Sequence, residues 1–104
     1  MAEELQVTNN TADHRFEVRL GDETAFAEYV IHKGSMVLPH TVVPPAFEGK
    51  GVASALAKAA LGYARAHDLK VKPSCPFMSA YIAKHPEWHD LVHKEFRSRL
   101  GLED

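Results

Sequence analysis

Two features of the sequence carry the residue types that chemistry needs: a glycine-containing loop at residues 48–54 and a single cysteine at position 75. A glycine-rich entry to a helix exposes unpaired backbone N–H groups at the positive end of the helix dipole, an arrangement that binds phosphate. A cysteine can act as a nucleophile, an acid or a redox-active thiol. The pair therefore points to a phosphate-bearing ligand that reaches a thiol.

The loop reads EGKGVAS and leads into an alanine-rich run. Its glycines lack a Cβ, so the backbone can approach an anion closely and adopt positive φ. The spacing matches neither the dinucleotide fingerprint nor the P-loop. Two glycines before a helix are more often a tight turn than a ligand site, so both interpretations stay open on the residues alone. The candidate cofactor-binding residues are Glu48, Gly49, Lys50, Gly51, Val52, Ala53 and Ser54.

The spacing of apolar residues predicts the strands that precede the loop. Residues 14–20 alternate apolar and charged side chains, as a half-buried strand does. Residues 24–34 and 35–43 are rich in strand formers, and the pair Pro44-Pro45 ends the second of them because proline cannot donate a ladder hydrogen bond. Residues 5–10 are a candidate short first strand.

From Lys50 onward the apolar period becomes helical. Val52, Leu56 and Tyr63 fall on one face of an amphipathic helix of about four to five turns. Residues 69–75 then predict a strand reached by a parallel-type crossover. Residues 76–85 and 86–100 predict two helical segments, each with proline at the first turn. The sequence therefore predicts an α+β fold whose mixed sheet is mostly antiparallel.

The length, composition, net charge and cysteine count of the chain limit its function further. A chain of 104 residues, 45% hydrophobic and 25% charged, predicts one globular domain over residues 1–104. A net charge of −2 gives no broad electrostatic footprint for nucleic acid or for an anionic membrane. One cysteine excludes an internal disulfide, and no apolar run reaches the roughly 18 residues of a spanning helix. Because the N-terminus carries acids rather than a hydrophobic signal core, we expect a cytoplasmic protein.

Residues 40–88, about half of the chain, resemble a small single-domain GNAT-like family of predicted N-acetyltransferases. The motifs are H-T-x-V at residues 40–43, E/R-G-x-G at 48–51 and P-x-C-P/S-[FY] at 73–77. The resemblance implies a shortened three-layer GNAT-like fold, acetyl-CoA as cofactor, and its pyrophosphate on residues 49–54. Glu48 stands where the wider superfamily carries Arg or Gln, and a carboxylate there repels a pyrophosphate unless it turns outward or caps the helix.

The resemblance also implies a place for the thiol. The strands over residues 35–43 and 69–75 would lie side by side and splay to admit the pantetheine arm. The backbone of Thr41, Val42 and Val43 would then pair with the pantetheine amides. Cys75 would lie near the thioester as a nucleophile, as an acid for the departing thiolate, or as pocket lining. His40 would accept the proton of an attacking ammonium, or it is a half-exposed strand residue with a local partner.

Three histidines four residues apart, His85, His89 and His93, would line one face of a continuous helix and invite zinc. Pro86 makes a helix break after the first of them the expected result. The segment HPEWH also differs from the zinc-protease pattern H-E-x-x-H, because its glutamate is one position late. We therefore expect a solvated histidine face and no metal site.

The first functional hypothesis is an N-acetyltransferase that acts on a primary amine of a small molecule or a protein lysine. The alternative with the same fold is a non-catalytic CoA-binding or partner-docking module. A third hypothesis is a thiol enzyme that relies on an external thiol, because the chain has no resolving cysteine. We expect no nucleic-acid or membrane partner, and a monomer or a weak dimer.

Overall fold

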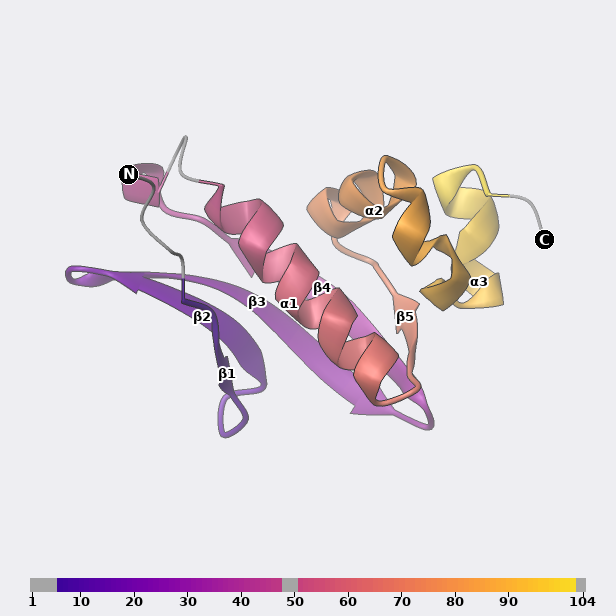
Figure 1. Ribbon diagram of the computed structural model, residues 1–104, viewed down its shortest axis with the longest axis horizontal. Coiled ribbons are helices and arrows are strands. Elements are labelled where there is room, and N and C mark those ends of the chain that lie inside the picture. The colour runs from indigo at the N-terminus through magenta and orange to yellow at the C-terminus, as the bar shows by residue number, and fades with distance from the viewer. Residues whose placement is uncertain (1–5, 48–50, 103–104) are drawn as a thin grey trace.

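The computed structural model describes residues 6–47 and 51–102, which contain one five-stranded sheet and several helical segments (Figure 1). The strands lie side by side in sequence order. The first four pair antiparallel, and the fifth pairs parallel with the fourth. This confirms the predicted α+β class and the mostly antiparallel mixed sheet. The strands are β1 (Thr8–Asn10), β2 (Arg15–Leu20), β3 (Glu23–His32), β4 (Ser35–Val42) and β5 (Lys70–Lys72).

Two of the helical predictions are confirmed and one is wrong. The long helix α1 (Val52–Ala66) and the shorter α2 (Pro76–Ala83) lie where the sequence predicts them. The predicted helix over residues 86–100 is instead broken at Val92, which is extended and bridges to Val71. The break has a physical cause, because β5 offers an unpaired edge to this segment. The remaining segments are η1 (Pro45–Phe47), η2 (Pro86–Leu91), α3 (Lys94–Arg97) and η3 (Ser98–Leu100).

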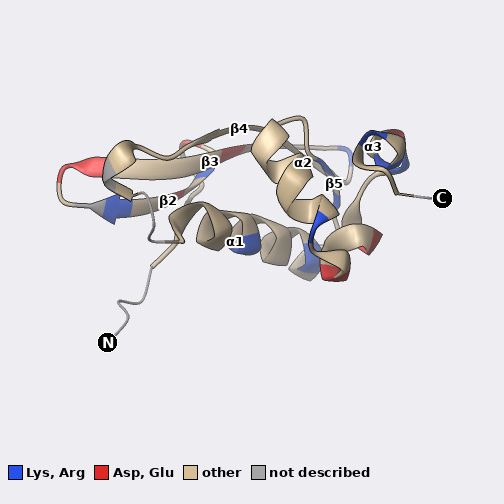
Figure 2. Ribbon diagram, turned by 90° about the horizontal axis from the view of Figure 1, so that it is seen from above, with Lys and Arg blue, Asp and Glu red and all other residues tan. Residues whose placement is uncertain are grey.

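Helix α1 lies along one face of the sheet (Figure 2). On β3, Ala25 and Ala27 are fully buried, and their small side chains let the helix backbone come close. Between them and beyond them, alternate residues point to the opposite face of the sheet. The apolar stripe of α1 completes this core with Val52, Leu56, Ala57, Ala60, Leu61 and Ala64.

Strand β4 contains a bulge that decides where it separates from β5. Glu28 pairs with His40 and Val30 with Val37, so two residues of β4, Leu38 and Pro39, face one residue of β3. A bulge bends its strand, and proline fits there because it has no N–H to pair. The parallel pairing with β5 ends at Val37. Past this point β4 continues along β3 without a partner strand on its β5 side.

Arg65, in the last turn of α1, holds the η2 segment against the helix. Its guanidinium donates to both carboxylate oxygens of Asp90, at 3.1 and 3.0 Å, and to the Glu87 carbonyl at 2.6 Å. The hydrogen bonds from Arg65 keep the pKa of Asp90 below its ordinary value. Stability from this pair is therefore present above the pKa of unfolded Asp90 and is lost as pH falls through the lower folded value.

We expect Asp90→Asn to lower the free energy of unfolding at pH 7 by less than about 1 kcal/mol, because the pair is exposed and screened by solvent. At pH 3 the difference from the parent protein should shrink, since the parent carboxylate is then losing its charge. Urea unfolding at the two pH values measures both quantities. Glu23→Gln is the control, because Glu23 is exposed and has no side-chain partner among the described residues. A deficit that persists unchanged at pH 3 contradicts this account.

Candidate active site

The described part of the glycine loop begins at Gly51, the N-cap of α1. Its φ of 70° and ψ of 18° are left-handed, a conformation that favours glycine. A Cβ built at this position would meet no atom within 4 Å, so the backbone angle rather than space calls for glycine. The predicted loop residues Glu48, Gly49 and Lys50 lie outside the described residues. Their predicted contribution to cofactor binding stays a prediction.

The first turn of α1 keeps its N–H groups available for an anion. Among the residues that the structure describes, no side chain caps this turn, and the turn itself carries no acidic residue. The N–H groups of Val52, Ala53 and Ser54 have no partner within the helix, as in any first turn. Val52 is buried and fixes the turn to the core, whereas Ser54 is exposed. This end of the helix therefore combines a rigid attachment with free donors.

The C-terminal half of β4 has one open backbone edge. Thr41 and Val42 pair with Ala27 and Phe26 of β3, and both are half-buried, as is Val43. On the other side the parallel pairing with β5 has already ended. An extended ligand can hydrogen-bond such an edge as an added strand does. The structure thus places Thr41 and Val42 at the end of β4, with Val43 directly after it, and their predicted pairing with a pantetheine arm stays a prediction.

Cys75 is the N-cap of α2, as predicted, with Pro76 at the first helical position. The flanking residues Ser74 and Pro76 predict an unburied thiol at the end of a strand, and both parts of this expectation are corrected. Strand β5 ends at Lys72, three residues before the cysteine, and the side chain is buried, with only 6% of its surface exposed. The burial follows from the main chain, because the Cys75 N–H donates to the Leu38 carbonyl at 2.9 Å and draws the residue against β4.

The thiol of Cys75 is aimed at β4. Its Sγ donates to Thr41 Oγ1 at 3.5 Å and makes no capping hydrogen bond to α2. Thr41 therefore orients the thiol at the place where β4 and β5 separate. The sequence gives no sign of this contact, because the two residues are far apart in the chain and meet only through the parallel pairing of β4 with β5.

His40 is exposed on β4 and lies opposite Glu28 of β3. It precedes Thr41 in an extended strand, so its side chain points to the other face of the sheet. The structure therefore brings Cys75 and Thr41 together and leaves His40 on the far side of the same strand. The two predicted catalytic side chains flank the strand rather than touch each other.

The three histidines after α2 do not form the predicted solvated face. Nδ1 of His85 lies 2.6 Å from the Tyr81 carbonyl, and Nε2 of His89 lies 2.8 Å from the Ile82 carbonyl, so both half-buried rings satisfy the last carbonyls of α2. His93 instead accepts the Glu95 N–H as the N-cap of α3. Within residues 6–47 and 51–102, no group of three or more potential ligands is placed to hold a metal ion.

Helix α2 also carries a buried phenol, that of Tyr81. Tyr81 is 7% exposed and stacks on His85 with ring centroids 4.0 Å apart. Burial raises the pKa of Tyr81 above its ordinary value, so the phenol is neutral at physiological pH.

No helix in the described ranges is long and apolar enough to cross a membrane.

Comparison with known proteins gives one consistent result. Residues 15–91 match the model of the family described as GCN5-related N-acetyl-transferase. Protein NATD1 of Gallus gallus is 34% identical over 92 residues, which cover 86% of this chain and 84% of the relative. Protein NATD1 of Homo sapiens is 33% identical over 85 residues, covering 79% of this chain and 75% of the relative. The matched region contains β2 to η2 and with them the open edge of β4, the start of α1 and Cys75. The chain belongs to the GCN5-related N-acetyltransferase family.

Proposed function

We propose that this protein binds acetyl-CoA and transfers the acetyl group to a primary amine. The observation that carries the proposal is the separation of β4 from β5, with the Cys75 thiol directed at Thr41 in the separated part of β4. The first turn of α1 adds an anion-binding helix end. An anion-binding helix end, an open strand edge and a thiol are the features that would bind a ligand with a diphosphate, an amide-containing arm and a thioester.

In this proposal the N–H groups of Gly51 to Ser54 bind the diphosphate, supported by the helix dipole. The backbone of Thr41, Val42 and Val43 binds the amides of the pantetheine arm. The sequence predicts a contribution from Glu48, Gly49 and Lys50, which lie outside the described residues. Donors that belong to the main chain need no particular side chain, which leaves the surface side chains of the loop free to vary.

Acetyl-CoA supplies an activated acetyl thioester, whose carbonyl carbon is open to attack by a neutral amine. Cys75 then holds a proton at Sγ for the departing sulfur, or accepts the acetyl group transiently, while Thr41 keeps the thiol aimed at the open edge. His40 lies on the other face of β4, so it would take the proton that the ammonium loses through an ordered water. Free backbone N–H groups of β4 stabilise negative charge on the acetyl oxygen.

A non-catalytic coenzyme-binding module is the second candidate, and one observation favours it. The Cys75 side chain is 6% exposed and already donates to Thr41. A thiol so placed can serve as pocket lining without taking part in chemistry. The two candidates share the coenzyme site and differ only in turnover.

Incubation with acetyl-CoA and two acceptors, a polyamine and a lysine-containing peptide, separates the candidates. Intact-mass measurement of the protein reports retained coenzyme and any acetyl adduct on Cys75, and chromatography of the acceptors reports transfer. Acetylated acceptor without an adduct supports direct transfer, and an adduct that disappears when acceptor is added supports an acyl-enzyme. Coenzyme retention with neither product supports the binding module.

His40→Gln should lower the turnover number by roughly tenfold to a hundredfold, because loss of a general base costs about that much or more. Steady-state kinetics with saturating acetyl-CoA measures it. His32→Gln is the matched control, since His32 is also exposed on the sheet but lies at the end of β3 that turns into β4. Equal turnover in the two variants contradicts the role given to His40.

A further inference from the structure

A pocket of about 610 Å³ lies away from the coenzyme site, where the β1–β2 turn meets β3 and the C-terminal half of α1. Its volume is within the range of small-molecule sites. None of the residues proposed to hold the coenzyme lines it. The lining residues are Thr11, Asp13, His14, Glu28, Tyr29, Val30, Ile31, Pro39 and Tyr63.

The pocket collects the exposed apolar surface of the described chain. Val30 and Ile31 are 52% and 45% exposed, and they are the large hydrophobic residues that the described structure leaves open to solvent. They are exposed because β3 runs past the start of β2, whose pairing begins with Arg15 opposite Glu28. Exposed apolar side chains gathered at one concavity are typical of a binding site.

Aromatic rings form another wall. Tyr29 and Tyr63 are stacked with centroids 6.1 Å apart, and His14 meets Tyr29 edge to face at 6.2 Å. Tyr63 also stacks on His67 with centroids 4.0 Å apart, and Tyr29 is only 3% exposed, so the ring faces are largely covered by other rings. This wall therefore suits the apolar portion of a ligand.

The charged residues that line the pocket favour a positively charged ligand. Its lining contains two carboxylates, Asp13 and Glu28, and neither lysine nor arginine. The Glu28 carboxylate accepts no hydrogen bond and forms no ion pair among the described residues, and the residue opposite it on β4 is the exposed His40. The cation nearest to it along the strand pairing, Arg15, is engaged elsewhere, by Glu17 and by the face of Phe26 at 4.4 Å. The Glu28 charge is thus left for a ligand.

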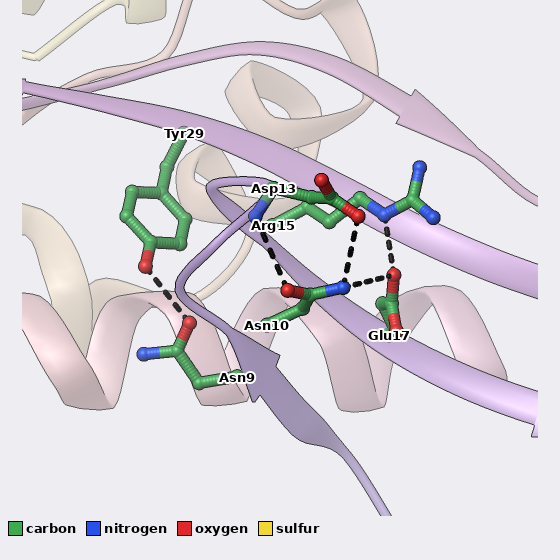
Figure 3. Close-up of polar contacts among 6 residues, drawn as sticks. All are labelled: Asn9, Asn10, Asp13, Arg15, Glu17 and Tyr29. Atoms are coloured by element: carbon green, nitrogen blue, oxygen red, sulfur yellow. Dashed lines mark hydrogen bonds and ion pairs between the residues drawn. The ribbon is translucent and has the colours of Figure 1, made fainter.

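A hydrogen-bond network fixes the turn that carries the other carboxylate (Figure 3). The Asn10 amide donates to Asp13 Oδ2 and to Glu17 Oε2, each at 3.1 Å, and the Asp13 N–H donates to Asn10 Oδ1 at 3.1 Å. The Tyr29 hydroxyl donates to Asn9 Oδ1 at 2.8 Å. Two walls of the pocket are therefore held in place before any ligand arrives, which lowers the entropy cost of binding.

We propose that this pocket binds a small organic cation, an ammonium group attached to an apolar or aromatic body, and that such amines are the acceptor class of the enzyme. The free edge of β3 offers only three residues, Val30 to His32, for pairing with an extended peptide, whereas the pocket beside it, about 610 Å³ in volume, has the size of a small-molecule site. The structure favours a small amine over a protein lysine for that reason.

The assignment as acceptor site rests on the proposed function, whereas the assignment as cation site does not. The link between the two sites is β4. Pro39 lines the pocket, the preceding Leu38 holds the Cys75 main chain, and the following residue is His40. Pro39 is thus next to His40 and two residues from Thr41, which contacts the Cys75 thiol.

Titration of the ¹⁵N-labelled full chain with benzylamine tests the proposal by NMR. We expect saturable shifts at the amides of Tyr29, Ile31 and Tyr63, with a dissociation constant on the order of 1 mM for so small a ligand. Benzyl alcohol, the neutral analogue, should bind several times more weakly. Glu28→Gln should raise the benzylamine dissociation constant about twofold to fivefold, while the same change at the exposed Glu23, outside the pocket, should not.

Three results overturn the proposal: no saturable shift at the pocket, equal affinity for benzyl alcohol, or equal weakening by Glu28→Gln and Glu23→Gln. A lysine peptide that binds more tightly than benzylamine, with shifts along β3, overturns the choice of a small amine. Steady-state kinetics separates the cation-binding claim from the claim that the pocket is the acceptor site. Benzylamine binding without acetyl transfer leaves the cation site standing and removes the acceptor role, whereas transfer with a KM unaffected by Glu28→Gln removes the pocket from the reaction.

Discussion

Ser54→Asp should weaken coenzyme A binding by about tenfold or more while leaving the protein at least as stable as before. The carboxylate would stand at the first turn of α1, beside the N–H groups proposed to hold the diphosphate, and like charges a few ångströms apart repel by a few kcal/mol at a partly exposed site. The same charge favours the helix, because the first turn has no acid and Gly51 has no side-chain cap. Calorimetric titration and thermal unfolding measure the two effects.

Ala66→Asp is the matched control for this variant. It adds the same charge at the other end of the same helix, where the side chain is also exposed. We expect the opposite pattern, since an acid at a helix C-terminus lowers stability by a few tenths of a kcal/mol or more and lies far from the proposed phosphate site. The proposed diphosphate position is wrong if both variants weaken coenzyme binding to the same extent.

Cys75→Ala should lower acetyl transfer by about a hundredfold or more, the usual effect of removing an acid or a nucleophile. The coenzyme contacts proposed here belong to the main chain, so the dissociation constant for coenzyme A should change by no more than about threefold, less than one kcal/mol. Loss of one buried sulfur should cost about 1 kcal/mol of stability through the small cavity that it leaves. Turnover, calorimetry and urea unfolding of one preparation report all three.

Thr41→Val separates orientation of the thiol from its chemistry. The substitution keeps the volume and removes the oxygen that Sγ contacts at 3.5 Å. We expect a loss of turnover smaller than that of Cys75→Ala, because the thiol remains and only its direction is freed. Turnover within about threefold of the parent protein in Cys75→Ala would contradict a catalytic thiol and would assign Cys75 to pocket lining in an enzyme that transfers the acetyl group directly.

The order of elements was predictable because each one carries its own local pattern. The alternation over residues 14–20 and the helical period after Lys50 record burial on one face, and the prolines at 44, 45 and 76 mark ends of elements. The segment 86–100 was mispredicted for a tertiary reason. Its apolar spacing suits a helix, but the backbone at Val92 and His93 pairs with Val71, a partner that local spacing cannot reveal.

The candidate site could likewise be predicted only in part, namely where its residues form local motifs. The H-T-x-V motif and the glycine loop are local and could be found from the sequence, as could the helix that begins at Pro76. The burial of Cys75 and its contact with Thr41 depend on the bulge in β4 and on the parallel pairing with β5. The amine pocket was missed altogether, because its residues come from four separate segments and share no motif.

Titration of the purified protein with coenzyme A in a calorimeter tests the central claim most directly, that the separated strands and the uncapped start of α1 hold this coenzyme. The account predicts a saturable heat with one site per chain and a dissociation constant in the micromolar range, as is typical of substrates and cofactors of metabolic enzymes. A titration that shows no saturable heat at millimolar coenzyme A, with the protein folded, contradicts it.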